Sequence, residues 1–394
     1  MLAQRVTYFS ESVIREMTRL ANRHNAINLA QGMPDFETPQ EIKDAACRAI
    51  QDGHNQYAIT WGNPLLRTAI AHKAKRFNRL DWVDPEKHIT VCCGATECMM
   101  AAMLATVNAG DEVIVFQPFY ENYGPDGLLS GAKPVWVKLY QHADRDWQFD
   151  RDELSRAFGD KTRAIIINTP NNPTGKVFTR DELQFIAGLC IKHNALAITD
   201  EIYEHIIYDD LPHISIATLD GMQDRTITIS GLSKTFSVTG WRLGYVIAPE
   251  EITNGIRRVH DFLTVGAPHP LQIAGAAALA LPDSYYEKLR ADYRSRRSVL
   301  LKYLHDAGFI FSEPRGAYYV MTDVSNLARA DEDDTAFVRR LVETIGVAGV
   351  PGSSFYSPRE DGRRKVRFMW AKKEETLHAA GERLLKLKHA PLSA

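Results

Sequence analysis

The feature of this 394-residue chain that most limits its fold is the alternation of short apolar runs with longer helical patterns. Strands that alternate with helices in this way form a parallel sheet with helices packed on its faces. The sequence therefore predicts an α/β fold with a mostly parallel sheet flanked by helices. The strand-like runs are residues 88–93, 112–116, 134–139, 163–168, 195–199, 226–230 and 243–248. Helical patterns between them include residues 97–108, which Gly110 would close in the left-handed conformation that commonly ends a helix.

The two ends of the chain differ from this central part. Residues 1–40 end in the turn-rich GMPDFETP and are predicted to form an arm rather than a domain. After residue 283 come an Arg-rich helical pattern (284–307), a strand (318–323), a helix (335–345) and a last strand (365–370). We therefore predict a large domain over 41–283 and a small α+β domain over 284–394, with the N-terminal arm 1–40 joining the small domain.

Composition excludes several classes of protein. With 47 Lys and Arg against 49 Asp and Glu, the net charge of −2 argues against nucleic-acid and anionic-membrane partners. A membrane span needs about 18 consecutive apolar residues, which the sequence lacks, and its start shows no signal-peptide pattern. We therefore expect a cytoplasmic protein. The cysteines form no CxxC pair, so we expect reduced core residues and no metal site: Cys47, Cys92, Cys93, Cys98 and Cys190.

Polar groups follow several predicted strands, at the edge where open α/β sheets bind ligands. The segment CCGATE (92–97) brings free backbone N–H groups to a helix N-terminus, which suits an anion. The alternative is a tight turn with Thr96 as the helix cap. Residues 168–175 (NTPNNPTG) form a rigid loop, and Asp200 ends the next strand, three residues before Tyr203. Asp200 could meet a cation or cap the turn before Ile202.

The segment SGLSKTFSVTGWRLG places Lys234 just after a strand, with Arg242 eight residues later. A partly buried lysine in an electropositive site loses its charge more easily, which frees the amine to form a Schiff base. The alternative is a solvated surface lysine, but the flanking glycines and hydroxyl residues do not resemble an exposed helix face. No GxGxxG or GxSxG motif is present, and Gly175-Lys176 is followed by Val177, so it is not a P-loop.

Together these segments resemble the pyridoxal-phosphate aminotransferases of fold type I (class I/II). The resemblance is carried in shared order by QGMPDF (31–36), NQYAITWGNP (55–64), GDEVIVFQPFYENY (110–123), NTPNNPTGKVF (168–178), ITDEIYEHIIYD (198–209), SGLSKTFSVTGWRLGYV (230–246), GAYYVMTDVS (316–325) and VRFMWAKKEETL (366–377). Within the fold, the chain is most similar to the kynurenine aminotransferase, glutamine transaminase K and methionine aminotransferase group. The resemblance implies a mostly parallel seven-stranded sheet in a large domain that binds the cofactor pyridoxal 5'-phosphate.

The resemblance also implies catalytic roles. Lys234 would hold the cofactor as an internal aldimine and then act as general base. Asp200 would pair with the pyridine nitrogen and keep it protonated. Asn172 and Tyr203 would hydrogen-bond the phenolic oxygen of the ring, and Tyr120 would stack on its face.

Further residues would bind the phosphate and the substrate. Arg242 and the backbone N–H groups of Ala95 and Thr96 would hold the phosphate, with a hydroxyl from Ser230 or Ser233. Those serines are considered because Gly231 stands where the mammalian kynurenine/glutamine enzymes have a serine. Tyr57 would reach the phosphate of the other subunit, which implies a homodimer with shared active sites. Arg367 would bind the α-carboxylate of the substrate and Gly32 would face it; alone, Arg367 could be a surface residue.

The predicted activity is transfer of an amino group from an L-amino acid to a 2-oxo acid by a ping-pong route. The positions that match the aromatic side-chain pocket of the mammalian enzymes are Ile14, Thr96, Val265 and Gly266. A pocket without aromatic rings favours methionine, glutamine or leucine over kynurenine. A cysteine-conjugate β-lyase is the nearest alternative. A transcription regulator built on the fold would need an N-terminal DNA-binding extension, and QGMPDF at residue 31 leaves no room for one.

Overall fold

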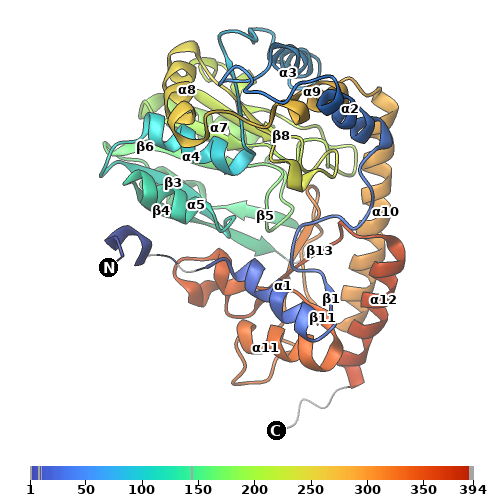
Figure 1. The fold of residues 1–394 in the computed structure, drawn as a ribbon. Coiled ribbons are helices and arrows are strands. Elements are labelled where there is room, and N and C mark those ends of the chain that lie inside the picture. The colour runs from blue at the N-terminus through green and yellow to red at the C-terminus, as the bar shows by residue number, and fades with distance from the viewer. Residues whose placement is uncertain (1, 8, 10, 143–144, 390–394) are drawn as a thin grey trace.

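The computed structural model describes residues 2–7, 9, 11–142 and 145–389. Its main element is one large twisted sheet with helices on both faces (Figure 1). From one edge to the other the strands are β2 (Ile89–Cys92), β9 (Gly244–Ile247), β8 (Thr226–Gly231), β7 (Leu196–Asp200), β6 (Thr162–Asn168), β3 (Glu112–Gln117), β4 (Lys133–His142) and β5 (Arg145–Phe149). Strands β8, β7, β6, β3 and β4 are parallel, whereas β9, β2 and β5 pair in antiparallel fashion. The α/β fold with a mostly parallel sheet is confirmed.

The sheet has eight strands in the described part of the chain, one more than the seven expected. The additional strand is β5, whose sequence RDWQF contains no apolar run. Within it, Trp147 and Phe149 are buried while Gln148 between them is exposed, so only one face of this edge strand packs on the core. A half-buried strand alternates apolar and polar residues, and a search for continuous apolar runs misses it.

The sheet core is built by the two-residue period of its strands. On β6, Ile165 and Ile167 pack into the cluster on one face, and Ala164 and Ile166 pack into the cluster on the other. Because both faces are covered by helices, the central strands consist almost entirely of buried residues. The helices of this part are α2 (Gln40–Gln51), α3 (Pro64–Arg76), α4 (Ala95–Thr106), α5 (Tyr123–Ser130), α6 (Arg151–Ala157), α7 (Arg180–Lys192), α8 (Glu250–Thr264) and α9 (His269–Leu279).

Some local expectations need correction. Helix α4 ends at Thr106, so Gly110 does not close it; Gly110 has the expected positive φ of 91° but lies in the following loop. Cys92, Cys98 and Cys190 are buried as expected, whereas Cys47 is exposed and is not a core residue. No helix among the described residues is long and apolar enough to cross a membrane.

The C-terminal part lies beside one end of the large sheet, and α10 runs along both (Figure 1). Its three-stranded antiparallel sheet has the order β10-β13-β12, and β1 from the N-terminal arm pairs in parallel with β11. The arm is thus hydrogen-bonded to the C-terminal part, and the proposed domain boundaries stay a prediction. The elements are α1 (Val13–Arg23), β1 (Ile27–Asn28), α10 (Asp283–Ala307), β10 (Tyr319–Asp323), α11 (Asp334–Arg340), β11 (Val347–Ala348), β12 (Val350–Pro351), β13 (Lys365–Met369) and α12 (Glu374–Leu385).

Candidate active site

Lys234 lies in the turn after β8, at the same sheet edge as the last residues of β6 and β7. Its Nζ atom lies 3.3 Å from the carbonyl oxygen of Gly32 and 5.8 and 5.7 Å from the ring centres of Tyr203 and Tyr318. Burial lowers the pKa of this amine, and the nearby Arg242 lowers it further. Lys234 is therefore a half-buried amine among aromatic rings, and it does not have the environment of a solvated surface lysine.

Asp200 ends β7 and is buried. Its Oδ2 accepts a hydrogen bond of 2.7 Å from the Tyr123 hydroxyl, and its Oδ1 accepts one of 3.3 Å from the backbone N–H of Ile202. Burial raises the pKa of Asp200, while the Tyr123 hydrogen bond and the charge of Lys234 oppose the rise. Asp200 thus caps the turn before Ile202 through one oxygen and faces the site through the other.

Tyr123 was not identified from the sequence as a site residue. It begins α5, three residues after Tyr120, inside the same quoted motif. The two rings meet edge to face, with their centres 5.7 Å apart, and Tyr120 is half-buried. The signal was therefore present as a second tyrosine in the motif, but nothing local showed which tyrosine would reach Asp200.

The loop after β6 joins the sheet edge to the C-terminal part. Asn168 donates a 2.8 Å hydrogen bond to the carbonyl of Asp200 and accepts one of 2.6 Å from the Asn172 backbone. The Asn172 side-chain oxygen in turn accepts a 2.8 Å hydrogen bond from Arg367. Asn172 is thereby held between the strand that carries Asp200 and the strand that carries Arg367.

Arg367 lies on β13 and is fully buried, so it is not a surface arginine. Besides Asn172, its guanidinium donates a 2.6 Å hydrogen bond to the Ala30 carbonyl, and it lies 4.4 and 4.9 Å from the ring centres of Tyr319 and Phe355. Among the described residues it makes no ion pair, and its Nε has no hydrogen-bond partner. A buried guanidinium without a carboxylate partner is suited to an anionic ligand.

Gly32 lies where the N-terminal arm passes the C-terminal strands. A Cβ atom at this position would lie 1.9 Å from the Tyr319 hydroxyl, so a larger residue does not fit. The Tyr319 hydroxyl lies 3.1 Å from that of Tyr203, and the Tyr318 hydroxyl donates a 3.1 Å hydrogen bond to the Gly32 carbonyl. Tyr318 and Tyr319 were not singled out from the sequence, although both stand in the quoted segment 316–325.

Arg242 and the start of α4 form a candidate anion site. The cap of α4 is Gly94, with φ 89°, and not Thr96, which lies in the first turn and is exposed. A Cβ atom on Gly94 would lie 2.4 Å from the Arg242 guanidinium, so the turn and the arginine are in close contact. The N–H groups of a first helical turn have no partner within the helix. Ala95, Thr96 and Arg242 therefore present several hydrogen-bond donors to one place.

Of the two candidate serines, Ser230 is used elsewhere. Its hydroxyl donates a 2.6 Å hydrogen bond to Glu204, whereas Ser233 has no such competing partner among the residues that the structure describes. A Cβ atom on Gly231 would lie 2.7 Å from the Leu243 carbonyl, and a serine does not fit there without a backbone shift. Tyr57 lies on the surface with 85% of its area exposed, and its predicted contact with another subunit stays a prediction.

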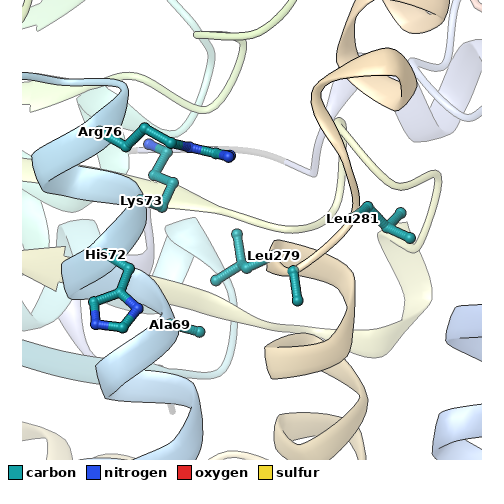
Figure 2. Close-up of a pocket in the computed structure, with 7 residues that line it drawn as sticks. Ala69, His72, Lys73, Arg76, Leu279 and Leu281 are labelled. Atoms are coloured by element: carbon teal, nitrogen blue, oxygen red, sulfur yellow. The ribbon is translucent and has the colours of Figure 1, made fainter.

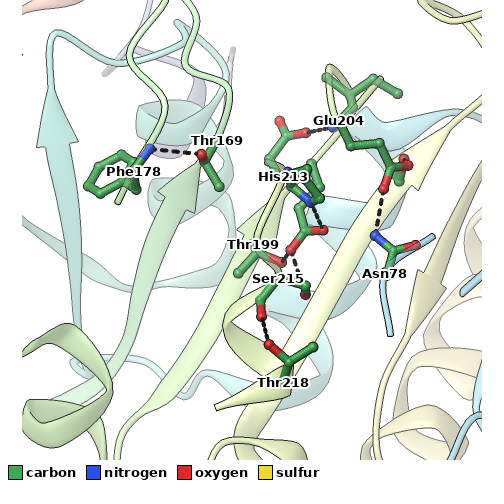
Figure 3. A network of polar contacts seen from close by, with 12 residues as sticks. Asn78, Thr169, Phe178, Thr199, Glu204, His213, Ser215 and Thr218 are labelled. Atoms are coloured by element: carbon green, nitrogen blue, oxygen red, sulfur yellow. Dashed lines mark hydrogen bonds and ion pairs between the residues drawn. The ribbon is translucent and has the colours of Figure 1, made fainter. Parts of the chain in front are cut away.

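Buried polar contacts surround the two glutamates on either side of Tyr203 in the sequence, and Figure 3 shows their partners Asn78, His213 and Ser215. Glu204 pairs with Lys73 at 2.5 Å and accepts hydrogen bonds from Asn78 and Ser230. Glu201 accepts hydrogen bonds from Thr199 and Ser215 at 3.0 and 2.9 Å, and lies 2.7 Å from Nε2 of His213. Burial alone would raise the pKa of Glu204, but Lys73, His205 and His213 together outweigh it and the pKa falls to about 2. This network fixes the turn after β7 to β8.

A cavity of about 310 Å³ lies between α3 and the end of α9 (Figure 2). Its lining includes His72, Lys73 and Arg76. Lys73 is paired with Glu204, and Arg76 is paired with Asp283. None of the predicted site residues lines this cavity, so it is separate from the site around Lys234.

Comparison with known proteins is consistent with this geometry. The profile of the family "Aminotransferase class I and II" matches residues 24–384. The chain is 38% identical to the probable N-succinyldiaminopimelate aminotransferase of Mycobacterium tuberculosis (99% of this chain, 100% of that protein). It is 35% identical to human kynurenine–oxoglutarate transaminase 1, over 95% of both chains.

Two solved structures are similar over almost their full length. The structure of N-succinyldiaminopimelate aminotransferase from M. tuberculosis superposes with a TM-score of 0.94 at 39% identity, covering 98% of this chain and 100% of that one. An Escherichia coli protein described as having a methionine aminotransferase function superposes with a TM-score of 0.91 at 34% identity, covering 98% of this chain and 99% of that one. The relatives thus share a reaction type while their named substrates differ.

Proposed function

Since this chain belongs to the class I and II aminotransferases, which depend on pyridoxal phosphate, we propose that it transfers the amino group of an apolar or amide L-amino acid to a 2-oxo acid. The donors we favour are methionine and glutamine, with other apolar or aromatic amino acids as weaker ones. The observation that carries the proposal is that Lys234, in the turn after β8, interacts electrostatically with both Asp200 at the end of β7 and Arg367 on β13.

The residues present fit the cofactor. Gly94 leaves no room for a side chain beside Arg242, so the turn and the guanidinium form a tight cradle for a phosphate. When bound, pyridoxal phosphate supplies an electron sink for the carbon that loses its proton. Asp200, oriented by Tyr123, is placed to hold a proton on a ring nitrogen, and Asn172 and Tyr203 are the candidates to bind a ring oxygen.

The chain's own groups can then perform the proton transfer. Because burial lowers its pKa, the Lys234 amine reaches the neutral form more easily than an exposed lysine. A neutral amine can take a proton from the α-carbon of a substrate and return it to another carbon of the same site. The Gly32 carbonyl, 3.3 Å from Nζ, orients the amine.

Arg367 is proposed to bind the α-carboxylate of the substrate. Its hydrogen bonds to Asn172 and Ala30 fix the guanidinium plane, so little rotational freedom is lost when a carboxylate binds. Its buried Nε has no hydrogen-bond partner in the part of the chain that the structure describes, which supports a free donor for a bound anion.

The side chain of the substrate is the least constrained part of the proposal. Ile14 is half-buried, whereas Thr96 and Val265 are exposed, and with Gly266 they supply no aromatic ring. Arg19 on the arm binds Glu11 through two hydrogen bonds of 2.6 and 2.8 Å, so it is not a free cation for a dicarboxylate. These features favour neutral donors of medium size.

We also propose a homodimer that shares its active sites and works in the cytoplasm. Tyr57, Phe262 and Leu65 expose 85%, 91% and 62% of their areas, and contact with a second copy of the chain would remove such apolar surface from water. Mixing inactive Lys234→Ala subunits with inactive Tyr57→Ala subunits tests this arrangement. If Tyr57 serves the partner's site, the mixed dimer contains one intact site and activity returns; if both residues serve the same site, it does not.

The function is tested with the absorbance of the purified protein. Adding methionine or glutamine without an acceptor should bleach the visible band of the lysine-bound cofactor, and a 2-oxo acid should restore it. A protein without such a band, or a band that survives Lys234→Ala, contradicts the proposal. Accumulation of pyruvate and ammonia from a cysteine conjugate, with the band unchanged, would identify a β-lyase instead. The donor preference is wrong if kynurenine or phenylalanine gives the highest kcat/KM.

A further inference from the structure

Glu97 and His260 form a buried polar pair between α4 and α8 that the site described above does not use. Nδ1 of His260 lies 2.7 Å from Oε1 of Glu97, and Nε2 lies 3.0 Å from the carbonyl oxygen of Thr60. The His260 side chain is 0% exposed and that of Glu97 is 9% exposed. Two groups that can carry charge are therefore enclosed together at the base of the candidate phosphate site.

The partners of this pair define its charge state. A backbone carbonyl only accepts hydrogen bonds, so Nε2 of His260 carries a hydrogen. The Glu97 carboxylate also accepts hydrogen bonds from the Cys93 N–H at 2.5 Å and the Thr264 hydroxyl at 2.7 Å. One hydrogen lies between Nδ1 and Oε1, and because the two further donors favour the ionised form of Glu97, we assign it to Nδ1, which makes the pair an imidazolium with a carboxylate.

The electrostatic surroundings agree with this assignment. Burial lowers the pKa of His260, but the interactions with the neighbouring Cys92 and Glu97 together outweigh it and raise the pKa to about 10. Burial raises the pKa of Glu97, but the hydrogen bonds from His260 and Thr264 outweigh it and lower the pKa below its usual range. Both groups are charged at neutral pH.

A metal ion is the alternative occupant, because Cys92, Glu97 and His260 have ligand atoms within 4.8 Å of one another. Two ligands of a tetrahedral zinc ion at bond lengths of about 2.0–2.1 Å lie roughly 3.3 Å apart. The 2.7 Å between Nδ1 and Oε1 is a hydrogen-bond distance, so a proton joins these atoms.

The pair contacts the segments that would bind a phosphate. Glu97 is the third residue of α4 and reaches back to the Cys93 N–H, which fixes the turn 93–96. Through the Thr60 carbonyl, His260 also holds the segment that carries Tyr57, and the neighbouring Asp261 accepts a 3.4 Å hydrogen bond from the Thr60 hydroxyl.

We propose that Glu97 and His260 are positioning residues for the cofactor phosphate: Glu97 holds the turn 93–96, and His260 neutralises the Glu97 carboxylate so that it does not repel the phosphate. This inference rests on the proposed function, since it assigns a phosphate to Arg242 and the α4 N-terminus. An unbalanced carboxylate in the first turn of a helix would oppose an anion bound by the same turn. The positive charge of His260 cancels this repulsion, and Glu97 keeps its hydrogen bond from the Cys93 N–H.

The test compares pyridoxal phosphate with pyridoxal, which lacks the phosphate, in their affinity for the cofactor-free protein. His260→Gln should weaken pyridoxal phosphate binding by about tenfold and leave pyridoxal binding unchanged, because only the phosphate meets the unbalanced charge. The double variant Glu97→Gln/His260→Gln removes both charges and should recover most of the loss. Titration calorimetry with inorganic phosphate on the cofactor-free variants should rank their phosphate affinities in the same order.

Glu332→Gln is the matched control, because it disrupts a largely buried ion pair with Arg340 in the C-terminal part, remote from the turn 93–96. It should alter stability without changing the ratio of the two affinities. In the cofactor-free protein, the ring nitrogens of His260 should both be protonated at pH 8.5 by NMR, and Glu97→Gln should abolish this.

Equal losses for both ligands in His260→Gln, or a double variant no better than His260→Gln, would overturn the inference. If the wild-type protein binds inorganic phosphate with this dependence on His260 but forms no Lys234-dependent band with pyridoxal phosphate, the proposed function fails and the charge-balance role stands.

Discussion

The two sides of the active site are built in different ways. At the carboxyl ends of the parallel strands, Asn168 and Asp200 are the last residues of β6 and β7, and Lys234 follows the end of β8 by three residues. On the other side, Arg367 lies within β13 and is held by Asn172 and Ala30, which are 195 and 337 residues away in sequence. The backbone of the groups proposed to do chemistry is therefore placed by strand ends, and long-range contacts from Tyr123 and Gly32 then orient the Asp200 and Lys234 side chains. The group proposed to bind substrate lies within a strand and is held by long-range contacts alone.

This contrast predicts that the largest loss of activity comes from the sheet edge. Lys234→Ala should lower kcat by a factor of roughly 10⁴, because it removes the proton-transferring amine. The candidate phosphate site should be unaffected, since Arg242 and α4 do not depend on this side chain. Single-turnover kinetics and calorimetry with inorganic phosphate measure the two effects. Loss of phosphate binding in this variant would show that the sheet edge is a single cooperative unit.

Arg367→Ala should produce the next largest effect, in substrate binding rather than in the cofactor. Removing one partner of a buried charged contact costs about 2–5 kcal/mol, or roughly 30-fold to 5,000-fold in kcat/KM. The loss should appear mainly in KM, and Arg367→Lys should recover only part of it because a lysine cannot bind a carboxylate through two nitrogens. The measurement is steady-state kinetics with methionine. The absorbance of the bound cofactor is recorded alongside and should not change. A loss confined to kcat would contradict the assigned division of roles.

Gly94→Ala tests the phosphate cradle. The added Cβ would lie 2.4 Å from the Arg242 guanidinium at a backbone φ of 89°, so both the contact and the conformation are unfavourable. We expect the affinity for pyridoxal phosphate to fall by roughly 10 to 100-fold, with a much smaller change for pyridoxal. Gly110→Ala is the matched control, since Gly110 also has a positive φ of 91° but no atom within 4 Å of its Cβ position. Equal affinities in the two variants would contradict the cradle.

Tyr123→Phe should have the smallest effect. Burial raises the pKa of Asp200 and the Tyr123 hydrogen bond lowers it, so losing the hydroxyl should raise the pKa further. The ionised carboxylate then forms only at higher pH, and the acidic limb of the kcat profile should move to higher pH. At neutral pH we expect a decrease in kcat of about tenfold, from the loss of one hydrogen bond to a charged group. A pH profile that scales down without moving would contradict this role for Tyr123.

The sequence predicted the fold and the polar residues that end its strands, because those signals are local. An apolar run followed by Asp200, or by a rigid loop such as 168–175, marks the end of a strand without knowledge of the rest of the chain. Strand β5 was not predicted because one face of it is exposed and its sequence contains no apolar run. The capping role of Thr96 was wrong because Gly94, with a positive φ, takes that position.

Other assignments depended on contacts that no local pattern records. Ser230 and Ser233 were equivalent candidates in the sequence, and the hydrogen bond from Ser230 to Glu204 separates them. In the same way, only the position of α5 shows that Tyr123, and not Tyr120, donates to Asp200.

By itself, the sequence determined the order of the elements and the residues at the carboxyl ends of the strands, because backbone propensity and burial act over a few neighbouring residues. Only the tertiary structure decided which buried charges meet. The Arg367–Asn172 contact, the Glu204–Lys73 pair and the Glu97–His260 pair each join segments far apart in the chain. A charge is stable inside a protein only when a partner reaches it, and that partner is chosen by the packing of the whole fold.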